Sequence, residues 1–211
     1  YRIEPAGQPT GHVQTFRVAG ISRADHPLLT RREMVIDALH MVFTGRVDND
    51  VLNRLTVELG IAWRDVDLLR AYINYLHQLG AAHTGVFMAD TFCQHANITR
   101  ALLEHHKVRF DPALGIDKSQ REQRAAALVE EIHGALVAVL SPAQDNFLRL
   151  LLNLLSATLR TSHFQTRDAT AEHRVSFKVD PAHIVLGTEP RTECELHRGG
   201  IRGWFKRFFG G

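Results

Sequence analysis

The residues best suited to chemistry lie near the end of the sequence, where cations, aromatic rings and glycines alternate. Residues 197–211 read HRGGIRGWFKRFFGG. Glycine lets a ligand approach the backbone amides closely, and arginine offers a planar fork that binds a carboxylate through two hydrogen bonds. The candidate ligand-binding residues are therefore Arg198, Gly199, Gly200 and Arg202.

Two other interpretations of this tail stay open. The segment is also typical of a strand and turn whose apolar partners belong to polypeptide beyond residue 211. Its interleaved cations and rings are equally compatible with an amphipathic tail that binds a membrane surface or single-stranded nucleic acid, through Trp204, Phe205, Lys206 and Arg207. The motif alone does not separate these possibilities.

Histidine and cysteine, which could supply metal ligands or a nucleophile, are placed unfavourably for either role. The sequence holds 13 histidines, but no two are three to five residues apart, so no helical pair can point at one ion. We expect no metal site and interpret the histidines as solvated or core residues. Cys93 follows Phe92 in a predicted helix, which favours a buried, inert thiol.

The short motifs of nucleotide binding and of hydrolase catalysis are missing from the sequence. It contains no GxGxxG turn, no GxxxxGK[ST] loop and no GxSxG elbow. We therefore predict that this chain carries no catalytic residue and binds no cofactor by itself.

Composition favours a globular protein without a polyanionic partner. An apolar fraction of 45% over 211 residues can bury a sizeable core, and 25 Lys and Arg nearly balance 23 Asp and Glu. We therefore expect neither nucleic acid nor a membrane as partner. Two distant cysteines and a polar start without a signal peptide indicate the cytoplasm. Because the chain starts without methionine and ends abruptly, we treat both ends as possible cuts.

Apolar residues recur at three- and four-residue steps along most of the chain, which predicts a series of helices packed on one another. The first is expected at residues 28–42, with a buried face made of Leu29, Val35, Ile36, Leu39 and Val42. The others are expected at 50–59, 63–79, 85–95, 97–109, 118–140 and from 142 through the apolar stretch 150–159. The buried faces of the last two include Leu140 and Leu159.

Two helix boundaries carry specific signals. Asp111-Pro112 ends the helix before it, since the residue preceding proline avoids helical backbone. Ser141, Pro142 and Gln144 open the last helix in the manner of a capping box, in which serine caps the free amides and glutamine returns a bond.

After Phe164 the apolar period changes from that of a helix to that of a strand. His173, Val175, Phe177 and Val179 alternate with polar residues, which predicts a half-buried strand, and residues 192–198 are a weaker candidate. We expect a mainly α fold, α+β overall, in which a multi-helix domain precedes a short β segment. The predicted divisions are a linker at 1–27, a helical scaffold domain at 28–165 and the β segment at 172–211.

Four segments carry a pattern more specific than helical periodicity. They read NRLTVELGIAWRDVDLLRAYINYLHQLG (53–80), ITRALLEHHKVRFDP (98–112), FLRLLLNLLSATLRTSHFQ (147–165) and RVSFKVDP (174–181). In this order and at this spacing they resemble the large NAD-specific glutamate dehydrogenases of bacteria, over about residues 30–200. Within them, Arg70, Tyr72 and Arg160 are interpreted as structural, because an arginine on a helix usually pairs with a neighbouring carboxylate or carbonyl.

The resemblance implies a scaffold and inter-domain part of an oxidoreductase that, intact, converts glutamate to 2-oxoglutarate and ammonia with NAD. The active lysine and the NAD-binding fold would lie in later polypeptide, and the β segment would begin the substrate domain. Arg198, Gly199, Gly200 and Arg202 are similar to the family's RGGLRW segment, which implies a place near the glutamate carboxylates, although the sequence departs from it at Gly203. Other domains of the same polypeptide, and further copies of it, would be the partners.

A function of another class stays open beside this one. The chain is also compatible with a non-catalytic helical module whose basic aromatic tail binds a partner protein. Continuation of the reading frame into a lysine-bearing substrate domain and a glycine-rich nucleotide-binding unit would separate the two.

Overall fold

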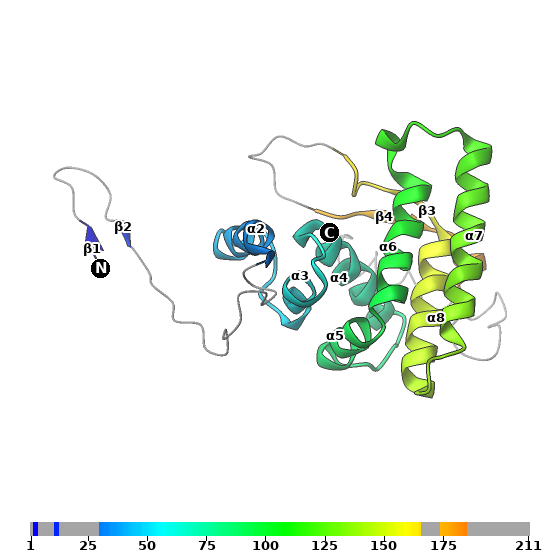
Figure 1. Cartoon of the computed structure of the whole chain (residues 1–211), viewed down its shortest axis with the longest axis horizontal. Helices are drawn as coiled ribbons and strands as arrows, with labels where there is room; N and C mark the ends of the chain where they lie inside the picture. The colour runs from blue at the N-terminus through cyan, green and yellow to red at the C-terminus, as the bar shows by residue number, and fades with distance from the viewer. Residues whose placement is uncertain (1, 4–10, 13–29, 166–173, 185–211) are drawn as a thin grey trace, which may run out of the picture.

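Helices dominate this computed structural model, which describes residues 2–3, 11–12, 30–165 and 174–184. They are α2 (Arg32–Phe43), α3 (Arg54–Leu59), α4 (Trp63–Gln78), α5 (Gly85–Gln94), α6 (Ala96–Phe110), α7 (Lys118–Leu136) and α8 (Pro142–Ala157). Strand β3 (Thr158–Thr161) follows α8 directly and pairs antiparallel with β4 (Phe177–Val179). A second antiparallel pair joins β1 (Arg2–Ile3) to β2 (Gly11–His12). The predicted mainly α fold with a short β segment is confirmed (Figure 1).

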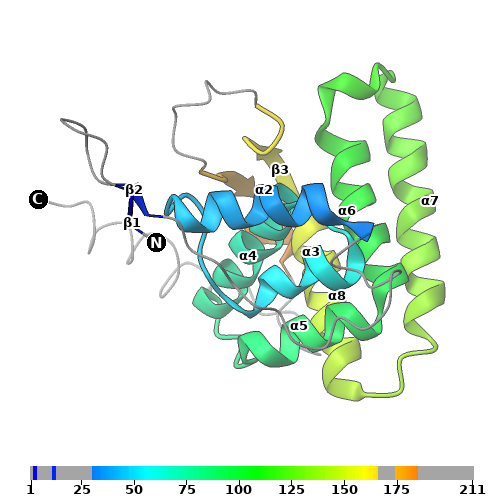
Figure 2. The same cartoon turned by 60° about the vertical axis from the view of Figure 1, so that its left-hand side comes forward.

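The core lies where α4, α5, α6 and α8 turn their apolar faces toward one another. Tyr72, Phe92 and Phe147 are its largest fully buried side chains. Helices α6 and α7 run side by side, and α8 contacts α4, α6 and α7 (Figures 1 and 2). Each buried leucine or phenylalanine of this core contributes about 1.5–3 kcal/mol relative to exposure. The apolar faces predicted for these helices form the interior of the fold.

Gly60 follows α3, which ends at Leu59, the last residue of the helix expected at 50–59. Its φ of 67° lies in the left-handed region, which glycine adopts without the strain that a Cβ would bring. A Cβ at this position would also meet the Arg31 side chain, whose Nε would be 2.9 Å away. The guanidinium of Arg31 in turn donates to the Val57 carbonyl oxygen, so the residue preceding α2 closes over the end of α3.

The buried face expected for the first helix is wrong in part. Helix α2 contacts α3 and α4 at the edge of the molecule and buries only Met41 completely. Ile36 and Leu39 were expected inside but are each 49% exposed, and Phe43 is 66% exposed on the same side of the helix. The helical period was predicted correctly, but the two neighbours of α2 cover only part of its apolar stripe.

Three details at the α7–α8 corner also differ from expectation. Helix α7 stops at Leu136, so Leu140 falls in a turn and is 95% exposed. Ser141 is the N-cap residue of α8 but its side chain forms no capping hydrogen bond. The Gln144 side chain does not return a bond either, since it donates to Gln94 Oε1 and accepts from His95. The capping box occurs instead at the start of α7, between Asp117 and Gln120.

Helix α8 ends before the apolar stretch 150–159 does. It ends at Ala157, and Leu159, expected on its buried face, lies in β3 and is 51% exposed. The rest of the stretch is the buried helix expected from its sequence. No helix within the described ranges is long and apolar enough to cross a bilayer.

Arg70 ties the start of the α3 region to α4 from inside the protein. Its side chain is 5% exposed, and its Nε and Nη2 donate to both carboxylate oxygens of Asp50, at 2.6 and 3.0 Å. Nη1 donates to Asp67 at 2.7 Å and Nη2 also donates to Asn53 at 3.0 Å. Burial opposes the charge, but the two carboxylates outweigh it and raise the pKa of Arg70. The predicted structural role of Arg70 is confirmed.

Replacing Arg70 with alanine should lower the free energy of unfolding by about 2–4 kcal/mol, because two partly buried carboxylates lose their partner. Urea unfolding followed by circular dichroism measures this change. Arg64→Ala, at an exposed position of the same helix where the guanidinium lies 4.9 Å from the Trp63 ring, is the matched control and should cost less than about 1 kcal/mol. Equal losses in the two variants would contradict the account.

Candidate functional site

Strand β4 lies in the segment whose apolar residues recur at every second position, and it pairs with β3. Val175, Phe177 and Val179 are half-buried, and Arg174, Ser176 and Lys178 between them are exposed, so the predicted half-buried strand is confirmed for the described residues. The register pairs Thr158 with Val179, Arg160 with Lys178 and Thr161 with Phe177, and an irregularity at Leu159 shifts it. Each strand therefore has an inner and an outer face.

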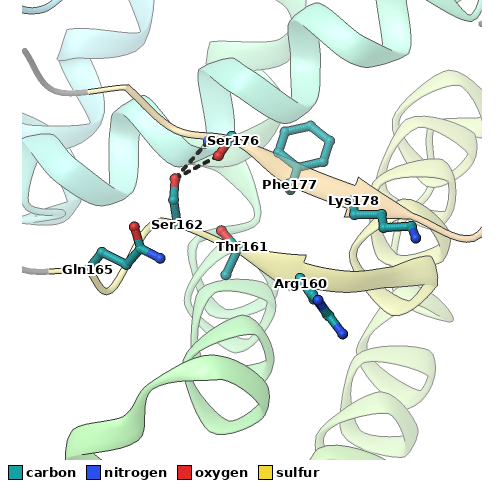
Figure 3. A pocket seen from close by; sticks show the side chains of 7 residues that line it. All are labelled: Arg160, Thr161, Ser162, Gln165, Ser176, Phe177 and Lys178. Atoms are coloured by element: carbon teal, nitrogen blue, oxygen red, sulfur yellow. Dashed lines mark hydrogen bonds between the residues drawn. The ribbon is translucent and has the colours of Figure 1, made fainter.

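The outer face of the strand pair carries two cations beside a shallow hollow. Register partners project to the same side of a sheet, so Arg160 and Lys178 stand next to each other (Figure 3). Both are exposed, and neither has an ion-pair partner in the part of the chain that the structure describes. The hollow has a volume of about 370 Å³ and is lined by Arg160, Thr161, Ser162, Gln165, Ser176, Phe177 and Lys178.

Two serines fix the end of this hollow. The backbone amide and the hydroxyl of Ser176 both donate to the Ser162 hydroxyl, at 2.9 and 3.0 Å, as Figure 3 shows. The Ser162 amide donates back to the Ser176 carbonyl at 2.9 Å. These bonds extend the pairing of the chain beyond the last strand residues and hold the two backbones at a fixed separation.

The inner face of the strand pair rests on α4 through aromatic rings. Phe177 stacks on Tyr72 with 4.3 Å between ring centroids and 17° between the planes. It also meets Tyr75 edge to face at 5.7 Å. Such pairs add about 0.5–1.5 kcal/mol to the burial of the rings. Lys178, the next residue after Phe177, is thereby held on the opposite face.

A buried hydrogen-bond chain attaches β3 to the helices. The Thr158 hydroxyl donates to the Leu154 carbonyl at 3.0 Å, so its single proton is used, and the Tyr72 hydroxyl donates to Thr158 at 2.9 Å. Burial raises the pKa of Tyr72, which keeps the phenol protonated. Tyr72 is thus structural, as the sequence predicts.

Arg109 completes this attachment from α6. Its guanidinium donates to the carbonyl oxygens of Leu155 and Thr158, at 2.5 and 2.7 Å, where α8 ends and β3 begins. Burial lowers the pKa of Arg109 below its ordinary value. These hydrogen bonds of the buried guanidinium go to main-chain carbonyl groups.

A second hollow of about 390 Å³ lies between α2, the start of α4 and α6. Its rim holds charges of both signs, Asp65 and Glu104 against Arg100 and Lys107. Asp65 accepts from the His163 ring at 3.1 Å, and Arg100 donates to the Leu59 carbonyl at 2.8 Å. Several of its polar groups are thus already engaged in holding the loop after α3 and the segment after β3.

His105 and His106 lie in the core and are neutral at pH 7. Their exposed fractions are 2% and 1%, and the His106 ring stacks on Phe164 with centroids 5.6 Å apart. Burial, with the nearby Arg109 cation, lowers the pKa of His105 to about 4. Burial, then the His163 and His105 rings, lowers the pKa of His106 to about 3. These two are core histidines, one of the two predicted classes.

Cys93 on α5 has the character of an unreactive thiol. Burial and the neighbouring Glu58 carboxylate raise the pKa of Cys93 to about 12, so little thiolate forms at neutral pH. Its side chain is half-buried and not fully buried as predicted. Within the residues that the structure describes, no three acidic, histidine or cysteine side chains gather as metal ligands would.

The residues predicted to bind a ligand, Arg198, Gly199, Gly200 and Arg202, lie outside the described residues, as does the strand candidate at 192–198. Sequence reasoning missed the exposed cation pair. Arg160 was interpreted as structural. It lies on a strand and has no carboxylate or carbonyl partner among the described residues, so that role stays a prediction. The alternation 175–179 placed Lys178 on an outer face, but the register that brings Arg160 opposite it is not visible in either segment alone.

Comparison with known proteins gives two family matches. Residues 47–112 match the model described as glutamate dehydrogenase, helical motif 3, and residues 131–202 match bacterial NAD-glutamate dehydrogenase, catalytic domain. The first range covers α3 to α6, and the second runs from the end of α7 through both strands.

Individual relatives agree with these matches. NAD-specific glutamate dehydrogenases of Pseudomonas aeruginosa and Halomonas elongata are 35% and 30% identical over 93% and 89% of this chain. The Mycobacterium tuberculosis enzyme of the same name is 33% identical over 76%. The matched regions are 12%, 12% and 10% of these three relatives, so the chain spans only about a tenth of their length.

Acidification should destabilise the protein through His105 and His106. In the unfolded chain both histidines bind a proton below about pH 6.5, whereas in the folded chain the pKa is about 4 for His105 and about 3 for His106. The contribution of these two groups to stability is therefore fully present above pH 6.5. It is lost as the pH falls toward the two folded-state pKa values, by about 1.4 kcal/mol per pH unit for each histidine. Urea unfolding at several pH values measures the slope.

His106→Leu should remove about half of this histidine-dependent slope, since His106 is one of the two groups that produce it. The substitution breaks no hydrogen bond within the described residues, because both ring nitrogens lack a partner there. His133→Leu, at an exposed position of α7, is the control and should leave the slope unchanged. An identical slope in the wild type and in His106→Leu would show that the core histidines do not resist protonation.

Proposed function

The chain belongs to the family of bacterial NAD-specific glutamate dehydrogenases, and we propose that it forms the support from which the catalytic domain of such an enzyme starts. In this proposal the intact protein oxidises glutamate to 2-oxoglutarate and ammonia with NAD. The helices of this chain hold the first strands of the substrate domain in place. The active lysine and the NAD-binding fold belong to polypeptide outside the 211 residues, and this chain alone is inactive and binds no NAD.

One observation carries the proposal. The region similar to the helical motif and the region similar to the catalytic domain contact each other directly, because Tyr72 of α4 stacks on Phe177 and bonds to Thr158. Arg109 of the helical-motif region likewise donates to the end of α8 and the start of β3. A linker would not need buried bonds of this kind. A support that sets the position of a catalytic domain would.

We further propose that other domains of the same polypeptide cover the exposed side of α2. Ile36 and Leu39 are half exposed there, and their burial would be favourable by about 25 cal/mol for each Å² covered. Homo-oligomerisation of the intact enzyme and a cytoplasmic location complete the proposal. Arg198, Gly199, Gly200 and Arg202 are proposed to lie near the glutamate carboxylates, as the similarity of their segment implies.

The complete reading frame that contains this chain should encode a protein that reduces NAD when glutamate is supplied. The formation of NADH, followed by its absorbance, measures the activity, and 2-oxoglutarate is the expected product. The 211-residue chain is the matched control, and it should give no heat of NAD binding in calorimetry and no NADH. An intact protein without glutamate-dependent NADH formation would overturn the proposal, and tight NAD binding by the isolated chain would overturn the assignment of the cofactor site to other polypeptide.

A further inference from the structure

Arg160 and Lys178, both positively charged, are register partners across β3 and β4. Directly opposed residues of an antiparallel pair have Cβ atoms about 5 Å apart, and like charges on such residues destabilise the pairing. Some exposed arginines of the described chain do have carboxylate partners, such as Arg54 with Glu58 and Asp90, and Arg149 with Asp145. The strand pair, in contrast, carries two adjacent cations with no carboxylate partner among the described residues.

We propose that Arg160 and Lys178 bind a carboxylate of the small dicarboxylate substrate of the intact enzyme. The identity of the dicarboxylate, glutamate or 2-oxoglutarate, rests on the proposed function. The carboxylate-binding character of the pair rests on its geometry. Arginine offers a fork that matches two carboxylate oxygens, and lysine adds a point charge from the neighbouring strand. One carboxylate between them would replace the repulsion with two attractions.

The hollow beside the two cations suits a ligand of this size and polarity. Its volume of about 370 Å³ lies in the range of small-molecule sites. The Gln165 side chain and the Thr161 hydroxyl line it with further polar groups, and the apolar contribution comes from Phe177. Figure 3 shows Arg160 projecting from β3 and Lys178 from the adjacent strand β4, both among the residues that line this hollow.

Both cations project from backbone that is fixed on its other face. Phe177, which precedes Lys178, is stacked on Tyr72 at 4.3 Å. Thr158, two residues before Arg160, receives the Tyr72 hydroxyl through its side chain and the Arg109 guanidinium through its carbonyl oxygen. A site whose supporting strands are held by buried contacts loses little entropy in its backbone when a ligand binds.

Titration of the isotopically labelled chain with 2-oxoglutarate at low, constant ionic strength tests the proposal. Nuclear magnetic resonance should record saturable shifts confined to residues 160–162 and 176–178, with a dissociation constant in the millimolar range typical of a small, open site. Arg160→Gln and Lys178→Gln should each weaken binding by about fivefold or more. Arg124→Gln, which removes an exposed cation of α7, is the matched control and should leave binding unchanged.

A second variant separates binding from a structural role. Lys178→Glu replaces the repulsion with an attraction to Arg160, so it should abolish binding while raising the melting temperature by about 1–3 °C. A lower melting temperature would show that Lys178 stabilises the strand pair as it stands, which contradicts the proposal. Circular dichroism also verifies that the glutamine variants remain folded.

Other results would contradict either the binding site or its selectivity for a dicarboxylate. Absence of saturable shifts in the wild type overturns it, as does equal weakening in Arg124→Gln. Equally tight binding of inorganic phosphate or NAD would show unselective attraction of anions. Because the proposed function is tested by NADH formation in the intact protein, that assay can succeed when this titration fails, and the two failures are distinguishable.

Discussion

The contact between Tyr72 and the β3–β4 pair is the interaction on which the arrangement of the described chain depends. A pair of strands this short is not stable in water alone, so its position must come from the surface beneath it. Tyr72 of α4 supplies both a ring for Phe177 and a hydroxyl for Thr158, and it is itself fully buried. The strands consequently follow the helices, and the geometry of the outer face follows the strands.

Three arginines in this small fold are satisfied in three different ways. Arg70 is buried and keeps its charge beside the carboxylates of Asp50 and Asp67. Arg109 is buried and serves the carbonyl oxygens at the end of α8. Arg160 stays in solvent opposite Lys178. The first two uses stabilise the body, and the third leaves a charge that a ligand can neutralise, which is why we assign binding to the outer face of the strands.

The sequence predicts the helices well because each buries a stripe against a neighbour that is present in the chain. Gly60, Asp111-Pro112 and the alternation of Val175, Phe177 and Val179 mark boundaries that depend on local backbone preferences, and the structure has them where expected. The predictions that are wrong concern contacts with residues distant in the sequence. Ile36 and Leu39 are exposed because α3 and α4 contact another side of α2, and Gln144 bonds across to α5 in place of its own helix end. The pairing of Arg160 with Lys178 is likewise a matter of register between segments.

Native-state hydrogen exchange tests the attachment of the strands to the helices most directly. The Asp180 amide donates to the Ala157 carbonyl and the Ser162 amide to the Ser176 carbonyl, each at 2.9 Å, so these two amides report on the strand pair. If Tyr72, Arg109 and Phe177 hold the pair as described, both amides will exchange on the same slow timescale as the core amides of α4 and α8. Exchange at the rate of an open loop, while α4 and α8 stay protected, would contradict the account.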